Sequence, residues 1–481
     1  MNYKMIFYFI GYVLLTVAVL MLFPLLVAVW YREPSGIIFL YCSVAIACIG
    51  GLLTRMKPEN SAFYAKDSFV VTALSWIVMS VAGSLPFYFS SAIPRFTDAL
   101  FECVSGFTTT GASILPEVEC LPNCMNFWRC LTQLIGGMGV IVFMLALIPS
   151  TGGQDLYLMK AESPGVNVGK LVPKVKKTAF YLYTIYFALT SLMIVGMVIA
   201  GAPVFDSICT SFTTTSTGGF GIRNTSLGAY PVAVQYVVAV FLFFSGINYS
   251  FYFYLAIRRF KDAFKMEEFL LYSLIFWGAV IVILLTLTKI GGYGMEEGFR
   301  AAFLQVGSIM TTAGFSSVDF DQWPSLAKTI LVMLMFAGGC AGSTCGGIKI
   351  SRLGIYMKTV RKEIRQLCHP RMVKVIKVDG KPLPHNHLRS ANIFLISYLF
   401  IFVISLLLVS VDNYDFTTNF TAVASALGNI GPGLSMVGPT KNFALYSDFS
   451  KIVLMFDMIA GRLEIFPLLV LFSPVTWKKN S

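Results

Sequence analysis

Long hydrophobic windows without a charged side chain recur along the chain. Each is long enough for a helix that crosses the hydrocarbon core, which takes about 20 residues; they span residues 5–31, 34–54, 68–94, 130–154, 178–205, 224–257, 269–288, 329–348 and 390–411. A further window, 452–477, is interrupted by Asp457, Arg462 and Glu464. The pattern predicts an all-α polytopic membrane protein. The first window is too long for a signal peptide and lacks a small-residue cleavage site, so we expect it to remain as a transmembrane helix.

Four shorter amphipathic segments lie between these windows, at residues 97–108, 204–214, 295–310 and 415–427. Their length suits a helix that enters only half of the membrane. Acidic residues or amides stand near their beginnings, where the helix dipole favours them; these are Asp98, Asp206, Glu296, Glu297 and Asn419. Such a helix, entering from outside, would point its negative C-terminal end at the membrane centre, where a dehydrated cation is stabilised.

Each short segment leads into a run rich in Thr, Ser and Gly, and the four runs can be aligned. They read FTTTGAS (107–113), TSTGGFG (215–221), TTAGFSS (311–317) and GNIGPGLS (428–435), and they align on Gly111, Gly219, Gly314 and Gly431. Two residues before the glycine stands Thr109, Thr217, Thr312 or Asn429, and six before it stands Ser105, Thr213, Ser308 or Ser425. A fourfold repeat separated by hydrophobic spans is how one chain builds a ring around a pore.

The composition of these runs suits an ion pathway. Backbone carbonyls can replace the water around a cation, and glycine allows the backbone conformations that turn carbonyls to one side. Small residues at membrane helix interfaces also serve close packing, but four copies in register favour the pore. The residues that we expect to bind the cation are Thr109, Thr110, Gly111, Thr217, Gly218, Gly219, Thr312, Ala313, Gly314, Asn429, Ile430 and Gly431. We call the four runs the candidate filter segments.

Charge sets the expected orientation. The chain is 56% hydrophobic and 12% charged, with a formal net charge of +12. The basic residues gather in alternate loops, which the positive-inside rule places in the cytoplasm together with both termini. This asymmetry explains the net charge, so we expect no nucleic-acid partner. The opposite loops are acidic and would raise the local cation concentration.

The windows and runs predict four repeats of helix, pore helix and helix around one pore. The expected divisions are an N-terminal helix pair at 1–66, pore repeat 1 at 67–177, repeat 2 at 178–266, repeat 3 at 267–388 and repeat 4 at 389–481. The third repeat would also hold a gate loop and a basic cytoplasmic loop.

Together with two further motifs, MFAGGCAGSTCGGIK (335–349) and DMIAGR (457–462), the four runs carry a family resemblance. Over essentially its whole length the chain resembles the potassium-translocating subunit of bacterial Trk systems, in the Trk/Ktr/HKT superfamily, and its extra N-terminal helix pair resembles the TrkH type. The resemblance implies potassium uptake across the bacterial inner membrane. It also implies a homodimer with one pore per protomer, and a cytoplasmic TrkA-type ring whose nucleotide-binding domains control opening. We expect K⁺ as the transported ion and no organic cofactor on this chain.

The resemblance also assigns roles to residues. It implies that the four aligned glycines are the glycines of the selectivity filter. In related plant transporters, serine at the first of these positions accompanies selectivity for sodium and glycine accompanies selectivity for potassium, so Gly111 implies a preference for potassium. The fourth segment departs from the third, with Asn429, Ile430 and Pro432 in place of Thr312, Ala313 and Phe315. This leaves the discrimination between potassium, sodium and rubidium open.

Two features suggest a gate. The glycines within 337–347 each cost a helix about 1 kcal/mol relative to alanine, and the resemblance implies a gate loop there, comprising Gly338, Gly339, Gly342, Ser343, Thr344, Gly346 and Gly347. A glycine-packed helix kink is the alternative. The resemblance places Arg462 in the pore as an electrostatic barrier; the alternative is a salt bridge to Asp457 or Glu464. Lys349, just past the loop, would mark the cytoplasmic mouth or interface.

Other motifs indicate less. GSTCGGIK lacks the strand and spacing of a phosphate-binding loop, and His369, His385 and His387 make an unconvincing metal site. A disulfide among Cys120, Cys124 and Cys130 is permitted but cannot be assigned. VIKVDGKPLP (375–384) predicts a β-hairpin that offers an edge to a soluble partner, or else a loop near anionic lipid.

Nothing suggests an enzyme, because no nucleophile or carboxylate pair is placed for catalysis. The alternative function is a secondary transporter that works by alternating access, with broken helices at the midplane. The sequence leaves open any coupling to protons or sodium, and the nucleotide that acts on the partner.

Overall fold

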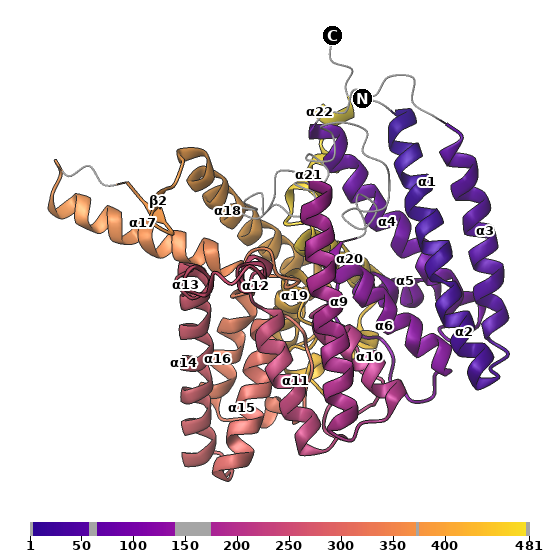
Figure 1. Cartoon of the computed structure of the whole chain (residues 1–481), viewed down its shortest axis with the longest axis horizontal. Helices are drawn as coiled ribbons and strands as arrows, with labels where there is room; N and C mark the ends of the chain where they lie inside the picture. Colours follow the sequence, from indigo (N-terminus) through magenta and orange to yellow (C-terminus); the bar gives the residue numbers. More distant parts are fainter. Residues whose placement is uncertain (1–2, 57–64, 140–174, 372–374, 478–481) are drawn as a thin grey trace.

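The computed structural model describes residues 3–56, 65–139, 175–371 and 375–477. These residues form a bundle of helices and one small ribbon (Figure 1). Six helices are long and apolar enough to cross a membrane, or seven if one bent pair counts as a span, within the part described. The predicted all-α polytopic membrane fold is therefore confirmed.

An N-terminal helix pair precedes the first repeat. α1 (Tyr3–Leu20) and α2 (Leu22–Tyr31) follow one another closely and pack against α3 (Gly36–Thr54). Gly11 of α1 meets Gly50 of α3 so closely that a Cβ on either would lie 2.9 Å from the other's carbonyl oxygen. Close backbone approach of this kind is how small residues hold membrane helices together.

Four units of similar order follow. Repeat 1 holds α4 (Ala65–Phe89), α5 (Phe96–Phe107) and α6 (Asn123–Met138); repeat 2 holds α9 (Val175–Ile199), α10 (Val204–Thr215), α11 (Val232–Ser245), α12 (Tyr249–Ala256) and α13 (Phe260–Phe264). Repeat 3 holds α14 (Glu267–Lys289), α15 (Met295–Met310), α16 (Ser325–Phe336) and α17 (Ile350–Cys368); repeat 4 holds α18 (His385–Val409), α19 (Phe416–Gly428), α20 (Asp448–Arg462), α21 (Phe466–Phe472) and α22 (Pro474–Trp477).

The four predicted half-membrane segments are the helices α5, α10, α15 and α19. Their C-terminal halves are buried because they lie at the centre of the bundle. Asp415 caps α19, and the hydrogen bonds that its carboxylate accepts from Thr418 lower the pKa of Asp415. An acid at this end also suits the helix dipole.

In each repeat the helix that follows the short helix stops or bends inside its hydrophobic window; the sequence predicts this interruption in repeats 3 and 4 but not in repeat 2. The window 224–257 is not one continuous span, because α11 and α12 meet at an angle of 92°. α6 ends at Gly139 with φ 82°, and α20 ends before Glu464 and Ile465, whose φ values are 52° and 73°. α16 ends at Phe336. The prediction for 140–154, the rest of one window, lies outside the described residues.

Three of the breaks, in repeats 1, 2 and 4, share a structural feature. Beside them, glycines lie directly against the ends of the short helices: a Cβ on Gly136 would lie 1.7 Å from Phe107 O, and one on Gly461 would lie 2.2 Å from Leu427 O. A Cβ on Gly246 would lie 2.8 Å from a side-chain carbon of Thr311. The long helices give way where the backbone of a candidate filter segment must fit.

The two described ends of the chain lie together. Tyr3 and Trp477 stack with ring centroids 6.4 Å apart, at the end of the bundle where both termini lie (Figure 1). α17 projects sideways from the bundle, and the ribbon β1 (Lys377–Val378) and β2 (Lys381–Pro382) lies between α17 and α18 in sequence. Asp379 and Gly380 both have positive φ, as a two-residue turn requires, so the hairpin prediction is confirmed.

Candidate functional site

The four candidate filter segments adopt the same backbone conformation. The residue two before each aligned glycine is left-handed, with φ between 54° and 58°; these residues are Thr109, Thr217, Thr312 and Asn429. The aligned glycines have φ values of 78°, 78°, 83° and 102°. A left-handed conformation is unusual for threonine and costs on the order of 1–3 kcal/mol. Three threonines share it, so surrounding contacts must hold it in place.

One hydrogen bond recurs in all four segments. The N–H just before each glycine donates to the carbonyl of the hydroxyl residue five positions earlier. The pairs are Thr110 to Ser105 at 2.9 Å, Gly218 to Thr213 at 2.7 Å, Ala313 to Ser308 at 2.8 Å and Ile430 to Ser425 at 2.9 Å. This bond folds the segment back against the end of its short helix. The alignment made from the sequence is therefore also an alignment in space.

The segments close into a ring. If a Cβ atom is added to each glycine, its nearest neighbour is a backbone carbonyl oxygen of the next segment. That oxygen belongs to the residue immediately before the next segment's aligned glycine. The distances are 2.1 Å from Gly111 to Gly218 O, 1.6 Å from Gly219 to Ala313 O, 2.1 Å from Gly314 to Ile430 O, and 2.9 Å from Gly431 to Thr110 O. The last contact returns to the first segment, so four glycines and four carbonyls alternate around one closed circle.

The helices repeat the same cyclic order. α10 packs against α6, α15 against α11, α19 against α16, and α5 against α20. Each short helix thus rests on the helix that follows the short helix of the preceding repeat. A chain of four unequal units encloses a centre in the way that four identical subunits would.

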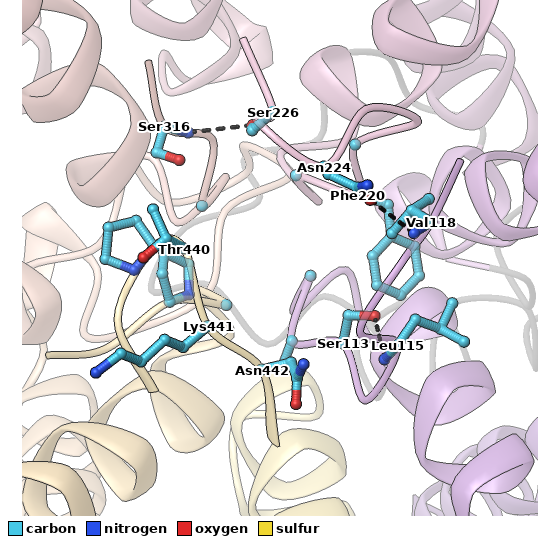
Figure 2. Close-up of a pocket in the computed structure, with 18 of the residues that line it drawn as sticks. Ser113, Leu115, Val118, Phe220, Asn224, Ser226, Ser316, Thr440, Lys441 and Asn442 are labelled. Atoms are coloured by element: carbon cyan, nitrogen blue, oxygen red, sulfur yellow. Dashed lines mark hydrogen bonds between the residues drawn. The ribbon is translucent and has the colours of Figure 1, made fainter. Parts of the chain in front are cut away.

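A pocket opens on one side of the ring. Its cavity volume is about 120 Å³, and all four aligned glycines line it. Ser113, Phe220, Ser316 and Thr440, from the four repeats, surround the opening (Figure 2). Among the described residues no Asp or Glu lines it. Three of the acids predicted for this side are in ion pairs instead: Asp98 with Lys451, Asp206 with Arg223 and Glu296 with Arg300.

The structure explains why the fourth segment has asparagine where the other three have threonine. Asn429 takes the left-handed position that threonine holds elsewhere, and asparagine tolerates this conformation well. Its Nδ2 donates to Thr110 Oγ1 at 2.9 Å and to Met458 O at 2.8 Å. The amide therefore joins the fourth segment to the first.

On the other side of the ring lies the glycine-rich loop 337–349. It is not helical: α16 ends at Phe336, α17 begins at Ile350, and Ala337 forms a parallel bridge with Ile348. The alternative of a kinked helix is therefore wrong. A Cβ on Gly346 would lie 2.4 Å from Gly428 O and one on Gly338 would lie 2.1 Å from Gly346 O, which explains why glycine is needed there. Gly342 and Gly347 have positive φ.

The loop touches the left-handed residues of the ring. Gly346 N–H donates to Thr312 Oγ1 at 2.8 Å, and Thr217 Oγ1 donates to Thr344 Oγ1 at 3.2 Å. The loop lies against Asn429 as well, because a Cβ on Gly346 would be 2.9 Å from that of Asn429. These contacts place the loop directly beneath three of the four segments.

Arg462 completes the contacts beneath the ring. Its guanidinium donates to Thr344 O at 2.6 Å and to Gly136 O and Gly137 O, each at 2.5 Å, and it lies 3.4 Å from Thr109 Oγ1. Glu464 and Asp457, the alternative partners of Arg462, contact other residues. Glu464 forms an ion pair with Arg352, and Asp457 accepts a hydrogen bond from Ser405 Oγ at 2.7 Å. Arg462 therefore joins the first segment to the loop.

The outer bend of the loop is held by residues that the sequence reasoning missed. Glu268, in the first turn of α14, accepts from Ala341 N–H at 2.6 Å. Asn248 Nδ2 donates to the same carboxylate at 3.2 Å. Cys340 N–H donates to Gly246 O and Tyr249 N–H donates to Gly342 O, so the bend between α11 and α12 supports the loop. An acid at the start of a long apolar window was the available signal for Glu268.

The β-hairpin connects to the same region. Asp379 Oδ1 accepts from the N–H of Glu267 at 2.9 Å, and Lys358 of α17 pairs with the Glu267 carboxylate and donates to Lys377 O. Lys349 is buried at the base of the loop and donates to Cys345 O. It is therefore part of the loop's own structure.

The remaining candidates stay apart from the ring. All ten cysteines are free: Cys120 donates to Glu117 at 3.0 Å, and Cys124 lies 3.3 Å from Ser35 Oγ. In the described part of the chain no group of three or more His, Cys, Asp or Glu residues could hold a metal ion. The site is thus a ring of backbone carbonyls with a loop and an arginine beneath it, which is the kind of site that handles dehydrated ions.

The fold and this ring define an all-α membrane protein with four pseudo-symmetric pore-helix repeats. The sequence profile of the TrkH family of cation transport proteins matches residues 35–479. The chain belongs to this family.

The relatives compared match along all or nearly all of their length. The chain is 35% identical over 485 residues to the Trk system potassium uptake protein TrkH of Salmonella typhimurium, covering 100% of both. It is 34% identical to the Trk system potassium uptake protein TrkG of Escherichia coli, covering 97% of each. The crystal structure of the potassium transporter TrkH from Vibrio parahaemolyticus superposes with a TM-score of 0.89 at 34% identity, covering 99% of this chain and 100% of that one.

Proposed function

We propose that this protein takes up potassium across the inner membrane of a bacterium as the translocating subunit of a Trk system. The observation that carries the proposal is the closed ring in which each filter glycine lies against a carbonyl of the next segment. Relatives named as Trk potassium uptake proteins, matched over their full length, support the choice of ion. The ring carbonyls would replace water around the ion, and the short helices would point their negative ends at it.

The loop 337–349 and Arg462 act as the gate in this proposal. In the present arrangement the loop touches the second, third and fourth segments and Arg462 reaches the first, so an ion leaving the ring would meet both. A fixed positive charge beside the path repels a cation. Opening would require the loop to leave its contacts with Thr217 and Thr312. The five divisions of the chain given above are part of the proposal.

Control from outside the chain completes the proposal. The relatives are named as proteins of Trk systems, and a system implies more than one component. We propose that this protein forms a homodimer and that a TrkA-type nucleotide-binding ring binds to the homodimer. The hairpin 377–382 and α17 would lie in the cytoplasm with both termini, where such a ring could reach them. Alternating access remains the competing function.

The function is tested by growth and rubidium uptake in a bacterium that lacks its own potassium-uptake systems. The wild-type protein, with its cytoplasmic partner, is expected to restore growth at low potassium. The Gly111→Ser and Gly314→Ser variants are expected to lose preference for potassium over sodium, since a side chain at either position would press on the neighbouring carbonyl. A protein that never restores growth, or variants that match wild type in both respects, would favour alternating access.

Removal of the Glu268 carboxylate tests the gate. The Glu268→Ala variant leaves the Ala341 N–H without its acceptor, at a cost on the order of 1–3 kcal/mol, so the loop should hold its position less well. We expect rubidium uptake without the partner to rise by about tenfold. Glu267→Ala is the matched control, because it removes a neighbouring carboxylate whose ion pair with Lys358 is partly exposed and makes no contact with the loop 337–349. Equal uptake by the two variants would argue against the gate.

A further inference from the structure

One helix contacts the candidate filter segments of two repeats. α6 carries Arg129 and Gln133 one turn apart, and both side chains are fully buried. Gln133 Nε2 donates to Gly218 O at 2.8 Å, and its Oε1 accepts from Phe220 N–H at 3.1 Å. The amide thus holds the backbone on both sides of Gly219. Gly218 O is also the oxygen against which Gly111 lies, at the junction between repeats 1 and 2.

Arg129 reaches the same junction from one turn earlier. Its guanidinium pairs with Glu102 of α5 at 2.7 Å and donates to Gly221 O at 3.1 Å. It also lies over the ring of Phe220, 4.3 Å from the centroid. Arg129 therefore holds the second segment two residues beyond Gly219.

Glu102 extends the contact to the first segment. Its carboxylate accepts from Ser113 Oγ at 3.0 and 3.1 Å and from Ile114 N–H at 3.1 Å. Both charges of the pair are buried, so removing either one would leave the other without compensation. We call Glu102 of α5, together with Arg129 and Gln133 of α6, the α6 clamp. The clamp fixes the distance between the first two segments.

The chemistry of the clamp suits a cation pathway. Gln133 holds a ring carbonyl with a neutral amide, which adds no fixed charge beside the ion. The charge of Arg129 is balanced by Glu102, so the clamp stiffens the ring without repelling the cation. A carbonyl held in this way cannot easily move inward to meet a smaller ion.

We propose that the α6 clamp determines how strongly potassium is preferred to sodium, by fixing Gly218 O at the junction between repeats 1 and 2. The inference rests on the proposed function and adds to it a positioning role for residues outside the filter segments. The three residues act through the backbone, and none of them needs to touch the ion.

The test compares two buried glutamines. Gln133→Leu removes both bonds to the second segment. Gln235→Leu is the matched control, because Gln235 is equally buried on α11 and also makes two hydrogen bonds, to Tyr230 O and from Arg300, but none to a ring residue. Rubidium and sodium uptake are measured separately for each variant, at equal protein levels in the membrane, with the partner present.

We expect Gln133→Leu to lower the ratio of rubidium to sodium uptake by about tenfold, while the Gln235→Leu ratio stays that of the wild type. If Gln133→Leu does not reach the membrane, Arg129→Lys serves instead. A lysine keeps the charge opposite Glu102 but cannot also reach Gly221 O with a planar fork, so the same loss of discrimination is expected.

The outcomes separate the two proposals. A wild-type protein that takes up no rubidium would overturn the proposed function itself. A selective wild-type protein whose Gln133→Leu and Arg129→Lys variants keep its ratio would overturn the clamp alone. Equal loss of discrimination in Gln133→Leu and Gln235→Leu would also overturn it, since buried packing rather than contact with the ring would then be responsible.

Discussion

Rubidium uptake is expected to be lost when Gly219 is replaced by alanine. The added Cβ would lie 1.6 Å from Ala313 O, far inside contact distance, and the atom it meets is backbone. The φ of 78° at this position is itself unfavourable for alanine. A distortion of the ring costing about 3 kcal/mol would slow passage by about 100-fold. Uptake of radioactive rubidium in the deficient strain measures the effect.

Two further substitutions make this prediction specific. Gly431→Ala is expected to keep more activity, because its Cβ would be 2.9 Å from Thr110 O rather than 1.6 Å. Gly278→Ala in the middle of α14 should behave like wild type, since nothing lies within 4 Å of the added atom. Normal uptake by Gly219→Ala at a normal membrane level would mean that ions do not pass through this ring.

The second large effect is expected at Arg462. Replacing it with glutamine removes a positive charge and its bonds to Thr344 O, Gly136 O and Gly137 O. A unit charge about 8 Å from a passing cation repels it by about 2 kcal/mol at an effective dielectric constant of about 20, so its loss should raise uptake by about 30-fold. The rate of rubidium uptake at saturating rubidium, with and without the partner, is the measurement.

Arg462→Lys separates the charge from the hydrogen bonds. Lysine keeps the charge but cannot reproduce the fork that spans three carbonyls, so uptake should rise much less than in Arg462→Gln if repulsion is the barrier. Arg365→Gln removes an exposed charge on α17 and should leave the rate measured without the partner unchanged. An Arg462→Gln protein with the wild-type rate would show that this arginine only holds helices together.

Much of the architecture was predictable because it depends on local patterns. The half-membrane helix α15 was predicted with its observed ends, since its length, its acidic start and the Thr/Gly run all lie within one short stretch. The alignment on Gly111, Gly219, Gly314 and Gly431 also corresponds to a repeated backbone conformation. Each of these signals is contained in a few consecutive residues.

What the sequence did not indicate depends on contacts between distant residues. Gln133 and Gly218 are far apart in the chain, and only the packing of α6 on α10 brings them together. The bend after Ser245 lies inside a charge-free window. The close approach of Gly246 to Thr311, the residue that follows α15, cannot be seen from that window. The hydrogen bonds of Arg462 to carbonyls of α6 and of the loop likewise join residues that are far apart in the sequence.

The four junctions of the ring are chemically different. The carbonyl against which the glycine of the preceding segment lies belongs to Thr110, Gly218, Ala313 or Ile430, and the distances between the added Cβ atoms and these oxygens are unequal. In a channel made of four identical subunits, any substitution is imposed four times at once. Here a mutation alters one quarter of the ring and leaves three intact. Under the proposed function, a sequence change can therefore alter ion preference at one junction at a time.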